Sequence, residues 1–368
     1  MRVVLTCASL SLSYGGPAFS VSRLARALAV SNLDVGLWAA DQSARTTPVL
    51  PADTPIQRLT GTEAEALDSF GRIDVLHDNG IWWRHNHRLA RLAGQRGIPR
   101  IVSTRGMLEP WAIKHKWWRK SIAWRLYQRR DLTQAQCHHT TSERECENLK
   151  RLGLGVPVCM IPNGIDIPEL DATCAAESDQ SCRLKKALFL GRLYEVKGLR
   201  NLIEAWALVR PQDWLLQIAG PDEAGHRAQL EKVVSAAGLG ESVSFLGPVD
   251  GASKRSVFLD ADLFVFPSHS ESFGMAIAEA LAHGLPVLTT TGAPWATLVE
   301  HGCGWWVAPT VDDIVGGLRD AMSRDPDTLR AMGVRGRAFV ATEFRWDWVA
   351  KQFLSTYEEL VAKRVHPC

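Results

Sequence analysis

The sequence lacks an excess of charge of either sign and lacks any long apolar run. Its 42 basic and 40 acidic residues leave a net charge of only +2 over 368 residues, so no global field is available to attract nucleic acid. No run of apolar residues approaches the ~18 that a membrane-spanning helix needs, and the apolar stretch after Met1 is too short for a signal peptide. We therefore expect a soluble or peripheral protein of the cytoplasm that does not bind nucleic acid.

Paired cysteines are also missing. The eight cysteines are scattered, without a C-x-x-C pair and without histidines at zinc-site spacing. Free thiols in a reducing compartment are the default for such a pattern. The composition that remains, 46% apolar and 22% charged residues, is that of a globular protein, and 368 residues suit two domains of ordinary size.

One stretch in the second half organises the chain. The run Leu263–Phe266 is wholly apolar, residues 267–272 form a polar loop, and the Ala-rich segment that follows meets stop signals at Gly284 and Pro286. This pattern predicts a strand, a loop, a helix and a second strand. The backbone N–H groups at the start of the predicted helix, around Phe273 and Gly274, have no partners within the helix and favour a phosphate there.

Two carboxylates flank the same position. Glu271 lies in the loop and Glu279 lies eight residues later, within the predicted helix. Carboxylates only accept hydrogen bonds, which suits them to hold sugar and ribose hydroxyls. The alternative is that Glu271 is a charge at a helix N-terminus and Glu279 a solvated surface residue.

The two glutamates carry a resemblance. Glu271-Ser-Phe-Gly-Met-Ala-Ile-Ala-Glu279, with Pro267-Ser268 before it and Gly284-Leu-Pro-Val-Leu288 after it, resembles the E-x7-E signature of retaining glycosyltransferases of family four, also called group 1. The resemblance implies an α/β protein of GT-B architecture, with two doubly wound, Rossmann-like domains facing across a cleft. It also implies that Glu271 holds the donor sugar during catalysis and that Glu279 holds the ribose.

Further donor contacts follow from the same resemblance. The segment Gly191-Arg-Leu-Tyr-Glu-Val-Lys-Gly198 is similar to the G-R-L-x-x-x-K-G loop, in which Arg192 and Lys197 would neutralise the diphosphate that departs. Ordinary surface cations are the alternative. The resemblance also implies that the following loop residues line the donor: Gly15 and Gly16, for which a tight turn is the alternative, and Gly220 and Pro248.

Domain boundaries come from the alternation of strand-like and helix-like segments, which predicts parallel sheets with ligands at the carboxyl ends of the strands. Residues 167–186 are polar and aperiodic, so we place a linker there. The first domain then spans 1–166 and the nucleotide-sugar domain 187–345, and in similar folds the helix over 346–368 crosses back onto the first domain.

Acceptor contacts are expected in the first domain. His77-Asp-Asn79-Gly resembles the H-x-H-G loop of the family, but Asn79 stands at the second histidine, and an amide cannot take a proton near neutral pH. His77 is therefore either an acceptor contact or a structural residue. Arg105 suits a phosphate on the acceptor or donor, and a salt bridge to Glu109 is the alternative.

The segment 111–130 holds seven basic residues, four tryptophans and no acid. Such a helix can lie on an anionic membrane, which would place the enzyme at the inner face of the cytoplasmic membrane. A solvated charged face with tryptophans packed in the core is the alternative.

Together with these features, the resemblance implies a retaining hexosyltransferase that moves a sugar from a nucleoside-diphosphate sugar to a hydroxyl of a glycan or lipid-linked glycan in bacterial cell-surface polysaccharide synthesis. Asp260-Ala-Asp262 imitates a D-x-D metal motif but precedes a strand, so we expect no catalytic metal and no cofactor. A nucleotide-sugar epimerase of the same fold and a regulatory module that binds nucleotide sugars are the alternatives.

Overall fold

The computed structural model describes residues 1–11, 14–51, 53–114, 117–169 and 183–365. The chain forms two compact units: the first comprises Met1–Gly164 with Phe344–Cys368, and the second comprises Ile165–Glu343. The boundary expected at residue 166 differs from this division by two residues. Most of the linker expected over 167–186, namely 170–182, lies outside the described residues.

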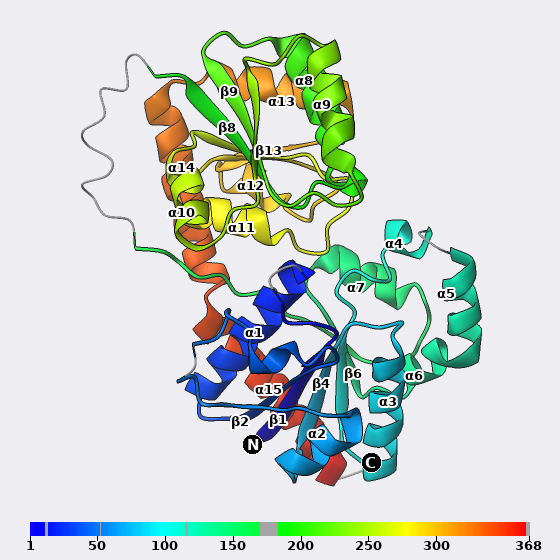
Figure 1. Cartoon of the computed structure of the whole chain (residues 1–368). Helices are drawn as coiled ribbons and strands as arrows, with labels where there is room; N and C mark the ends of the chain where they lie inside the picture. Colours follow the sequence, from blue (N-terminus) through cyan, green and yellow to red (C-terminus); the bar gives the residue numbers. More distant parts are fainter. Residues whose placement is uncertain (12–13, 52, 115–116, 170–182, 366–368) are drawn as a thin grey trace. The chain divides into compact units, whose positions relative to one another are not determined.

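The first unit is built on one parallel sheet of seven strands in the order β3-β2-β1-β4-β5-β6-β7 (Figure 1). Apolar residues fill the central strands because both faces of the sheet are covered. The strands are β1 Arg2–Cys7, β2 Asp34–Ala39, β3 Ile56–Arg58, β4 Val75–Asn79, β5 Arg100–Ser103, β6 Cys137–Thr140 and β7 Val158–Met160.

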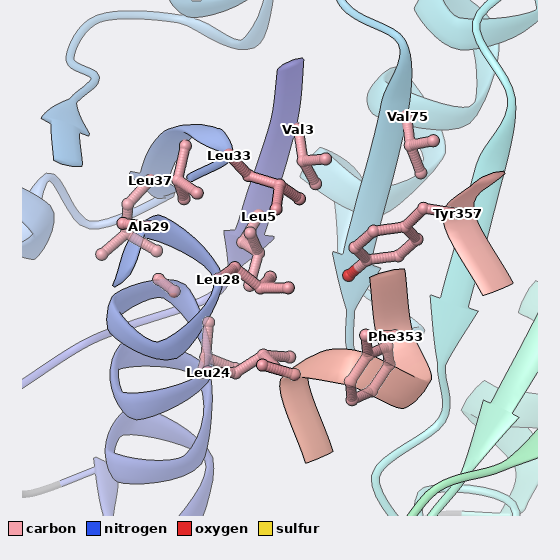
Figure 2. Close-up of a cluster of buried hydrophobic side chains, with 14 of the residues drawn as sticks. Val3, Leu5, Leu24, Leu28, Ala29, Leu33, Leu37, Val75, Phe353 and Tyr357 are labelled. Carbon is pink, nitrogen blue, oxygen red and sulfur yellow. The ribbon is translucent and has the colours of Figure 1, made fainter. Parts of the chain in front are cut away.

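Alternate residues of β1 enter different cores. Val3 and Leu5 pack with residues of the first and last helices, including Phe353 and Tyr357 (Figure 2), whereas Val4 packs on the opposite face with residues of α2 and α3. The helices and short turns of this unit are α1 Gly16–Val30, η2 Ser43–Arg45, α2 Glu63–Phe70, α3 Arg84–Arg96, α4 Pro110–Lys114, α5 Trp117–Ala123, η3 Trp124–Gln128, α6 Arg129–Thr133, α7 Glu143–Lys150 and α15 Trp346–Val365.

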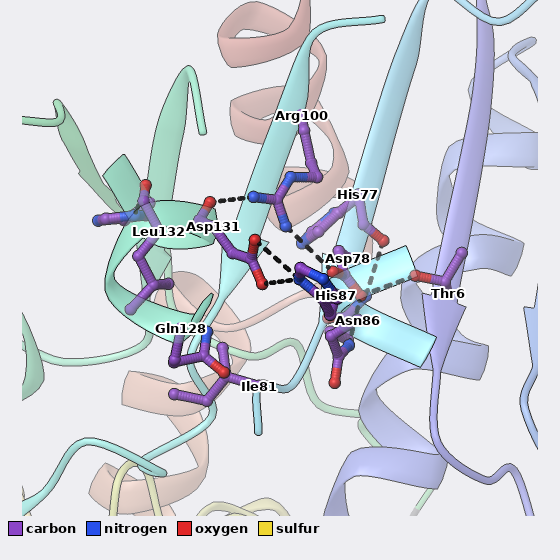
Figure 3. A network of polar contacts seen from close by, with 12 residues as sticks. Thr6, His77, Asp78, Ile81, Asn86, His87, Arg100, Gln128, Asp131 and Leu132 are labelled. Atoms are coloured by element: carbon purple, nitrogen blue, oxygen red, sulfur yellow. Dashed lines mark hydrogen bonds and ion pairs between the residues drawn. The ribbon is translucent and has the colours of Figure 1, made fainter. Parts of the chain in front are cut away.

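A buried polar network joins the strands of this unit (Figure 3). Asp78 accepts hydrogen bonds from Thr6 Oγ1 at 3.0 Å and Asn86 Nδ2 at 2.8 Å, and pairs with Arg100 at 3.4 Å. Burial raises the pKa of Asp78 to about 6, against the opposing effect of the Arg100 guanidinium. Because the ion pair satisfies charges that are fully desolvated, losing either partner would leave an uncompensated buried charge.

The second unit holds a parallel sheet of six strands in the order β10-β9-β8-β11-β12-β13. The strands are β8 Lys185–Leu190, β9 Trp214–Ala219, β10 Val243–Gly247, β11 Leu263–Phe266, β12 Val287–Thr290 and β13 Gly304–Val307. The expected α/β class with two doubly wound units is therefore confirmed. Three strands, β3, β7 and β13, were not predicted, because with three or four residues each they are too short to show a period.

Helices cover this second sheet with apolar stripes. In α8 the buried residues Leu199, Leu202, Ile203 and Trp206 recur at helical spacing. The helices and short turns are η5 Glu195–Lys197, α8 Leu199–Val209, α9 His226–Ala236, α10 Gly251–Leu259, α11 Met275–Ala282, α12 Thr297–Glu300, α13 Val311–Ser323 and α14 Pro326–Glu343. Across the described part of the chain, no helix combines the length and the apolar character needed to cross a bilayer.

Candidate functional site

The second unit has a topological switch point between β8 and β11. The chain leaves β8 to form β9 on one side, whereas β11 and β12 extend the sheet on the other side. In open parallel sheets such a point leaves a crevice at the carboxyl ends of the two strands, where ligands bind. The loops that follow these strands contain Lys197 and Glu271, two of the three residues predicted to act in catalysis.

The structure brings these two residues together although 74 positions separate them. Lys197 Nζ lies 2.5 Å from Glu271 Oε1, and the hydroxyl of Ser268 donates to the same carboxylate oxygen at 2.8 Å. The two side chains are only 13% and 12% exposed. The backbone N–H of Glu271 donates to the carbonyl of Gly292 at 2.9 Å, so Glu271 is held through both its backbone and its carboxylate.

Glycines allow the loops of this site to touch. At Gly198, with a φ of +68°, an added Cβ would lie 2.1 Å from the carbonyl oxygen of Pro267. At Gly220 an added Cβ would lie 1.9 Å from the carbonyl oxygen of Gly191. Backbone approach this close excludes any side chain, and it fixes the loops after β8, β9 and β11 against one another.

The helix α11 begins beside Glu271. Gly274, with a φ of +87°, occupies its N-cap position, and no side chain caps the helix there. Phe273 is buried, and its carbonyl accepts a hydrogen bond from the indole of Trp295 at 2.5 Å. The first turn of α11 therefore offers backbone N–H groups and the positive end of a helix dipole to an anion.

The remaining charged residues of the predicted donor site form separate pairs. Glu279 Oε1 lies 2.6 Å from Lys254 Nζ of α10, and both side chains are about a quarter exposed, at 23% and 25%. Arg192 Nη1 lies 2.7 Å from Glu223 Oε2 in the loop after β9, at a more exposed position. Lys254 was not predicted from the sequence, and only its pairing with Glu279 in the fold identifies it.

The other predicted donor residues lie in loops at the ends of strands. The backbone N–H of Gly220 donates to Gly247 at 2.8 Å, immediately before Pro248, so the loops after β9 and β10 are joined. In the first unit Gly15 is the N-cap of α1, with a φ of +78°, and Gly16 is the first residue of that helix. Their contact with a donor stays a prediction.

Arg105 lies at the carboxyl edge of the first sheet, in the loop after β5. Its guanidinium donates to Asn79 Oδ1 from Nε at 3.1 Å and Nη2 at 2.6 Å, and to Asn163 Oδ1 from Nη1 at 2.8 Å. Burial lowers its pKa to about 10. Glu109 instead accepts from Asn148 and pairs with Arg144, so the alternative of a salt bridge between Arg105 and Glu109 is wrong.

His77 has no exposed surface, and both of its ring nitrogens are engaged. Its Nδ1 lies 2.7 Å from Tyr357 Oη, and its Nε2 lies 2.6 Å from Ser103 Oγ, which in turn lies 2.6 Å from His139 Nδ1. His139 Nε2 lies 2.8 Å from the carbonyl oxygen of Ile161, which can only accept, so this nitrogen carries the proton. Each group of the series then donates to the next: Tyr357 to His77, His77 to Ser103, Ser103 to His139 and His139 to Ile161.

Burial keeps the imidazoles of His77 and His139 neutral, because it lowers the pKa of His139 to about 3 and that of His77 well below its usual value. The structural interpretation of His77 accounts for both of its ring nitrogens. A contact between His77 and an acceptor stays a prediction.

Asp260 and Asp262 have structural partners. Asp262 pairs with Arg183 at 2.6 Å and accepts from the backbone N–H of Lys186 at 2.8 Å, while Asp260 pairs with the side chain of Lys186 at 2.5 Å. These contacts agree with the structural interpretation of this Asp-Ala-Asp sequence. Among the residues that the structure describes, no three His, Cys, Asp or Glu side chains cluster as metal ligands would.

Comparison with known proteins places both units in known families. Residues 177–339 match the family described as glycosyl transferases group 1, and residues 15–164 match the glycosyl transferase 4-like domain. A phosphatidyl-myo-inositol mannosyltransferase of Mycobacterium leprae is 33% identical over 213 residues, which are 56% of this chain and 54% of that protein. A D-inositol 3-phosphate glycosyltransferase of Arthrobacter is 32% identical over 179 residues, which are 47% of this chain and 42% of that protein.

These alignments span about half the length of the curated relatives or less. Solved structures extend the likeness to the whole chain, at sequence identities that support only a common fold. Sucrose-phosphate synthase of Thermosynechococcus elongatus has a TM-score of 0.81 at 21% identity, covering 98% of this chain and 99% of that chain. HepE of Anabaena, in complex with UDP-glucose, has a TM-score of 0.74 at 18% identity, covering 98% and 100%.

Each unit thus matches a glycosyltransferase family over most of its length, and both adopt the parallel sheets of that fold. The chain is therefore built from two glycosyltransferase domains, a 4-like domain in the first unit and a group 1 domain in the second.

Proposed function

We propose that this protein transfers a hexose from a nucleoside-diphosphate sugar to an acceptor hydroxyl, with retention of the anomeric configuration. The observation that carries the proposal is the pair formed by Lys197 and Glu271, 2.5 Å apart at the switch point of the second sheet. The pair stands next to the uncapped first turn of α11. A cation, a carboxylate and a helix N-terminus in one crevice supply what a diphosphate joined to a sugar requires.

Each charged group has a separate task in this proposal. Lys197 and the N–H groups at Phe273 and Gly274 stabilise the negative charge that grows on the departing diphosphate. Glu271 accepts hydrogen bonds from hydroxyls of the transferred sugar, and Ser268 keeps its carboxylate in place. Glu279 accepts from the ribose, and Arg192 adds a second cation near the diphosphate. The proton of the acceptor hydroxyl passes to the leaving phosphate on the same face of the sugar, so that no protein base is required.

The surroundings of Arg105 suit a contact with an anionic group of the acceptor or of the diphosphate. Its three described hydrogen bonds go to neutral amide oxygens, and it forms no ion pair with a carboxylate within the described residues. A guanidinium with unused N–H groups matches the oxygens of a phosphate. We propose that Asn79 and Asn163 orient Arg105 for that contact.

The biological setting that we propose is cell-surface glycan synthesis at the inner face of the cytoplasmic membrane. Large apolar side chains of the basic segment are exposed: Trp117 at 65%, Trp118 at 52%, Ile122 at 53% and Leu126 at 75%. Trp124 instead packs with the core of the first unit. Exposed tryptophans interleaved with cations suit the surface of an anionic bilayer.

The donor test is a panel of nucleotide sugars, with UDP-glucose first because HepE of Anabaena binds it in the same fold. We expect one donor to raise the melting temperature, since a ligand at ~100 times its dissociation constant adds about 2.7 kcal/mol to stability. With an acceptor glycan, that donor should release free nucleoside diphosphate, and release should persist in excess chelator because no metal is required.

The alternatives predict other products. Conversion of the donor to an epimer without an acceptor would identify an epimerase, and donor binding without any turnover would identify a regulatory module. Activity that a chelator abolishes and only a divalent ion restores would overturn the proposed metal independence.

A further inference from the structure

The first unit contains a groove that none of the predicted donor or acceptor residues line. This groove has a volume of about 1100 Å³ and is lined by Arg100, Gln136 and Pro157, which stand at the amino-terminal ends of β5, β6 and β7. Asn79, the last residue of β4, and Arg105, which follows β5, lie instead at the carboxyl ends of their strands. Because the strands are parallel, the groove occupies the opposite edge of the sheet from these residues.

Cations from three helices line the groove. Arg91 comes from α3, Arg130 from α6 and Lys363 from α15, and all three are exposed. None of the three forms an ion pair within the part of the chain that the structure describes. Three charges of one sign around one recess repel one another, and this cost falls when an anion enters.

One carboxylate, that of Asp131, lines the groove. Asp131 lies 2.8 Å from His87 Nδ1, and its backbone carbonyl accepts from Arg100, whose guanidinium also pairs with the buried Asp78 (Figure 3). Three exposed cations thus share this lining with a single carboxylate, so the net charge that faces an incoming ligand is positive.

The walls of the groove are partly apolar. Leu126 and Tyr127 of η3, Ala93 of α3 and Leu360 of α15 take part in its lining. The volume is at the upper end of that of typical small-molecule sites, and a recess with apolar walls and a few polar groups is their usual form. A ligand that combines an anionic group with an apolar part fits this lining better than a bare ion does.

We propose that this groove binds a phosphate-bearing ligand through Arg91, Arg130 and Lys363. Two guanidiniums can each hold two phosphate oxygens, and the ammonium adds a third cation. The phosphate could belong to a membrane phospholipid or to a soluble compound. The proposal goes beyond the transfer reaction and does not depend on it, because it involves none of the residues of the donor or acceptor sites.

Calorimetric titration of the full chain tests this with three probes: dihexanoylphosphatidylglycerol kept monomeric, dihexanoylphosphatidylcholine, and inorganic phosphate. We expect the phosphatidylglycerol to bind more tightly than the phosphatidylcholine, whose head group has no net charge. Arg91→Ala with Arg130→Ala should weaken that binding about tenfold or more, because two charge-assisted contacts are lost. Both residues are exposed, so the fold should survive, and thermal melting checks this.

The matched control is Arg84→Ala with Arg26→Ala. Both are exposed arginines, Arg84 of α3 and Arg26 of α1, and their loss removes the same charge, but neither lines the groove. The control should change affinity less than about twofold, as expected for exposed charges away from a ligand. Equal affinities for phosphate and the phosphatidylglycerol would assign the site to a soluble phosphate, and binding of the lipid alone would assign it to a membrane. No binding of any probe, or equal losses in both double variants, would overturn the proposal.

Discussion

The carboxylate of Glu271 and that of Glu279 have different surroundings. Glu271 contacts Lys197 and Ser268 and its side chain is almost buried. Glu279 pairs with Lys254, and its side chain is about twice as exposed as that of Glu271. The proposed roles follow this difference, with the sugar at Glu271 and the ribose at Glu279. Isosteric substitutions can separate the two roles.

Glu271→Gln should lower turnover by ~10² to 10³, in line with losing one preorganised contact of a transition state. It should leave the affinity for free nucleoside diphosphate nearly unchanged, because that ligand has no sugar. Glu279→Gln should instead weaken the nucleoside diphosphate itself by roughly 1.5–3 kcal/mol. Calorimetric titration of one nucleotide into both variants measures this, and the opposite pattern would show that the roles are reversed.

Residue types at this site were predictable, but their pairing was not. The sequence motifs single out Lys197 and Glu271 separately, and only the fold shows that the two side chains meet across 74 positions. Lys254 carries no motif, since a lysine on a helix with weak amphipathic character is ordinary in sequence. Tyr357 lies 280 positions from His77, and no local pattern can connect residues so far apart.

At the scale of elements, the strongest apolar runs were predicted best. The range predicted for the strand Leu263–Phe266 agrees with β11 residue for residue, because a wholly apolar run bounded by Asp262 and Pro267 is unambiguous. The three residues of β3 include Gln57 and Arg58, and such a short edge strand shows no period. The segment 111–130 forms α4, α5, the π-helix η3 and the start of α6. No rule of residue spacing predicts which face of such a broken segment is exposed.

The helix α15 is held to the first sheet by Tyr357. Its hydroxyl donates to His77 and begins the chain of bonds that ends at Ile161. Tyr357→Phe keeps the ring in the core but leaves His77 Nδ1 buried without a donor, so the free energy of unfolding should fall by ~1–3 kcal/mol. Urea denaturation measures the loss, and an unchanged midpoint would show that the hydroxyl contributes nothing.

The exposed face of 111–130 supports a prediction about membranes. Charge reversal at Arg119, Arg125 and Arg129 should reduce sedimentation with phosphatidylglycerol vesicles at low salt, since each basic residue near an anionic surface contributes about 1 kcal/mol. Lys120 is a poor choice because its ammonium already donates to the carbonyl of Ala112, and Lys116 lies outside the described residues. Equal sedimentation of both forms would favour a merely solvated face.

At the scale of the whole molecule, buried histidines make stability depend on pH. Burial lowers the pKa of His77 well below its ordinary value, that of His138 to about 4 and that of His139 to about 3, whereas in the unfolded chain all three titrate near ~6.5. Below that pH the unfolded state binds more protons, so stability is lost as the pH falls. Burial also lowers the pKa of His85 and His283, which adds to this effect. Asp78, with its pKa raised to about 6, acts in the opposite direction, as do Glu109, Asp131 and Asp262, whose pKa values burial also raises.

We therefore expect the melting temperature to fall steadily between pH 6.5 and pH 5, with a net uptake of protons on unfolding. Calorimetry in buffers of matched ionic strength checks this. A melting temperature that is constant or rises over that interval would contradict the predicted protonation of these histidines.

The division of the chain also has a consequence for its synthesis. The second unit is continuous in sequence, but the first needs Phe353 and Tyr357 to fill the core around Val3 and Leu5. At ~5–20 residues per second, a ribosome takes roughly 10–40 s to reach α15 after it has made β7. During that time the face of the first sheet that α15 covers, including Val3 and Leu5, is exposed. The nascent chain can therefore be bound by chaperones or cut by proteases until α15 has been made.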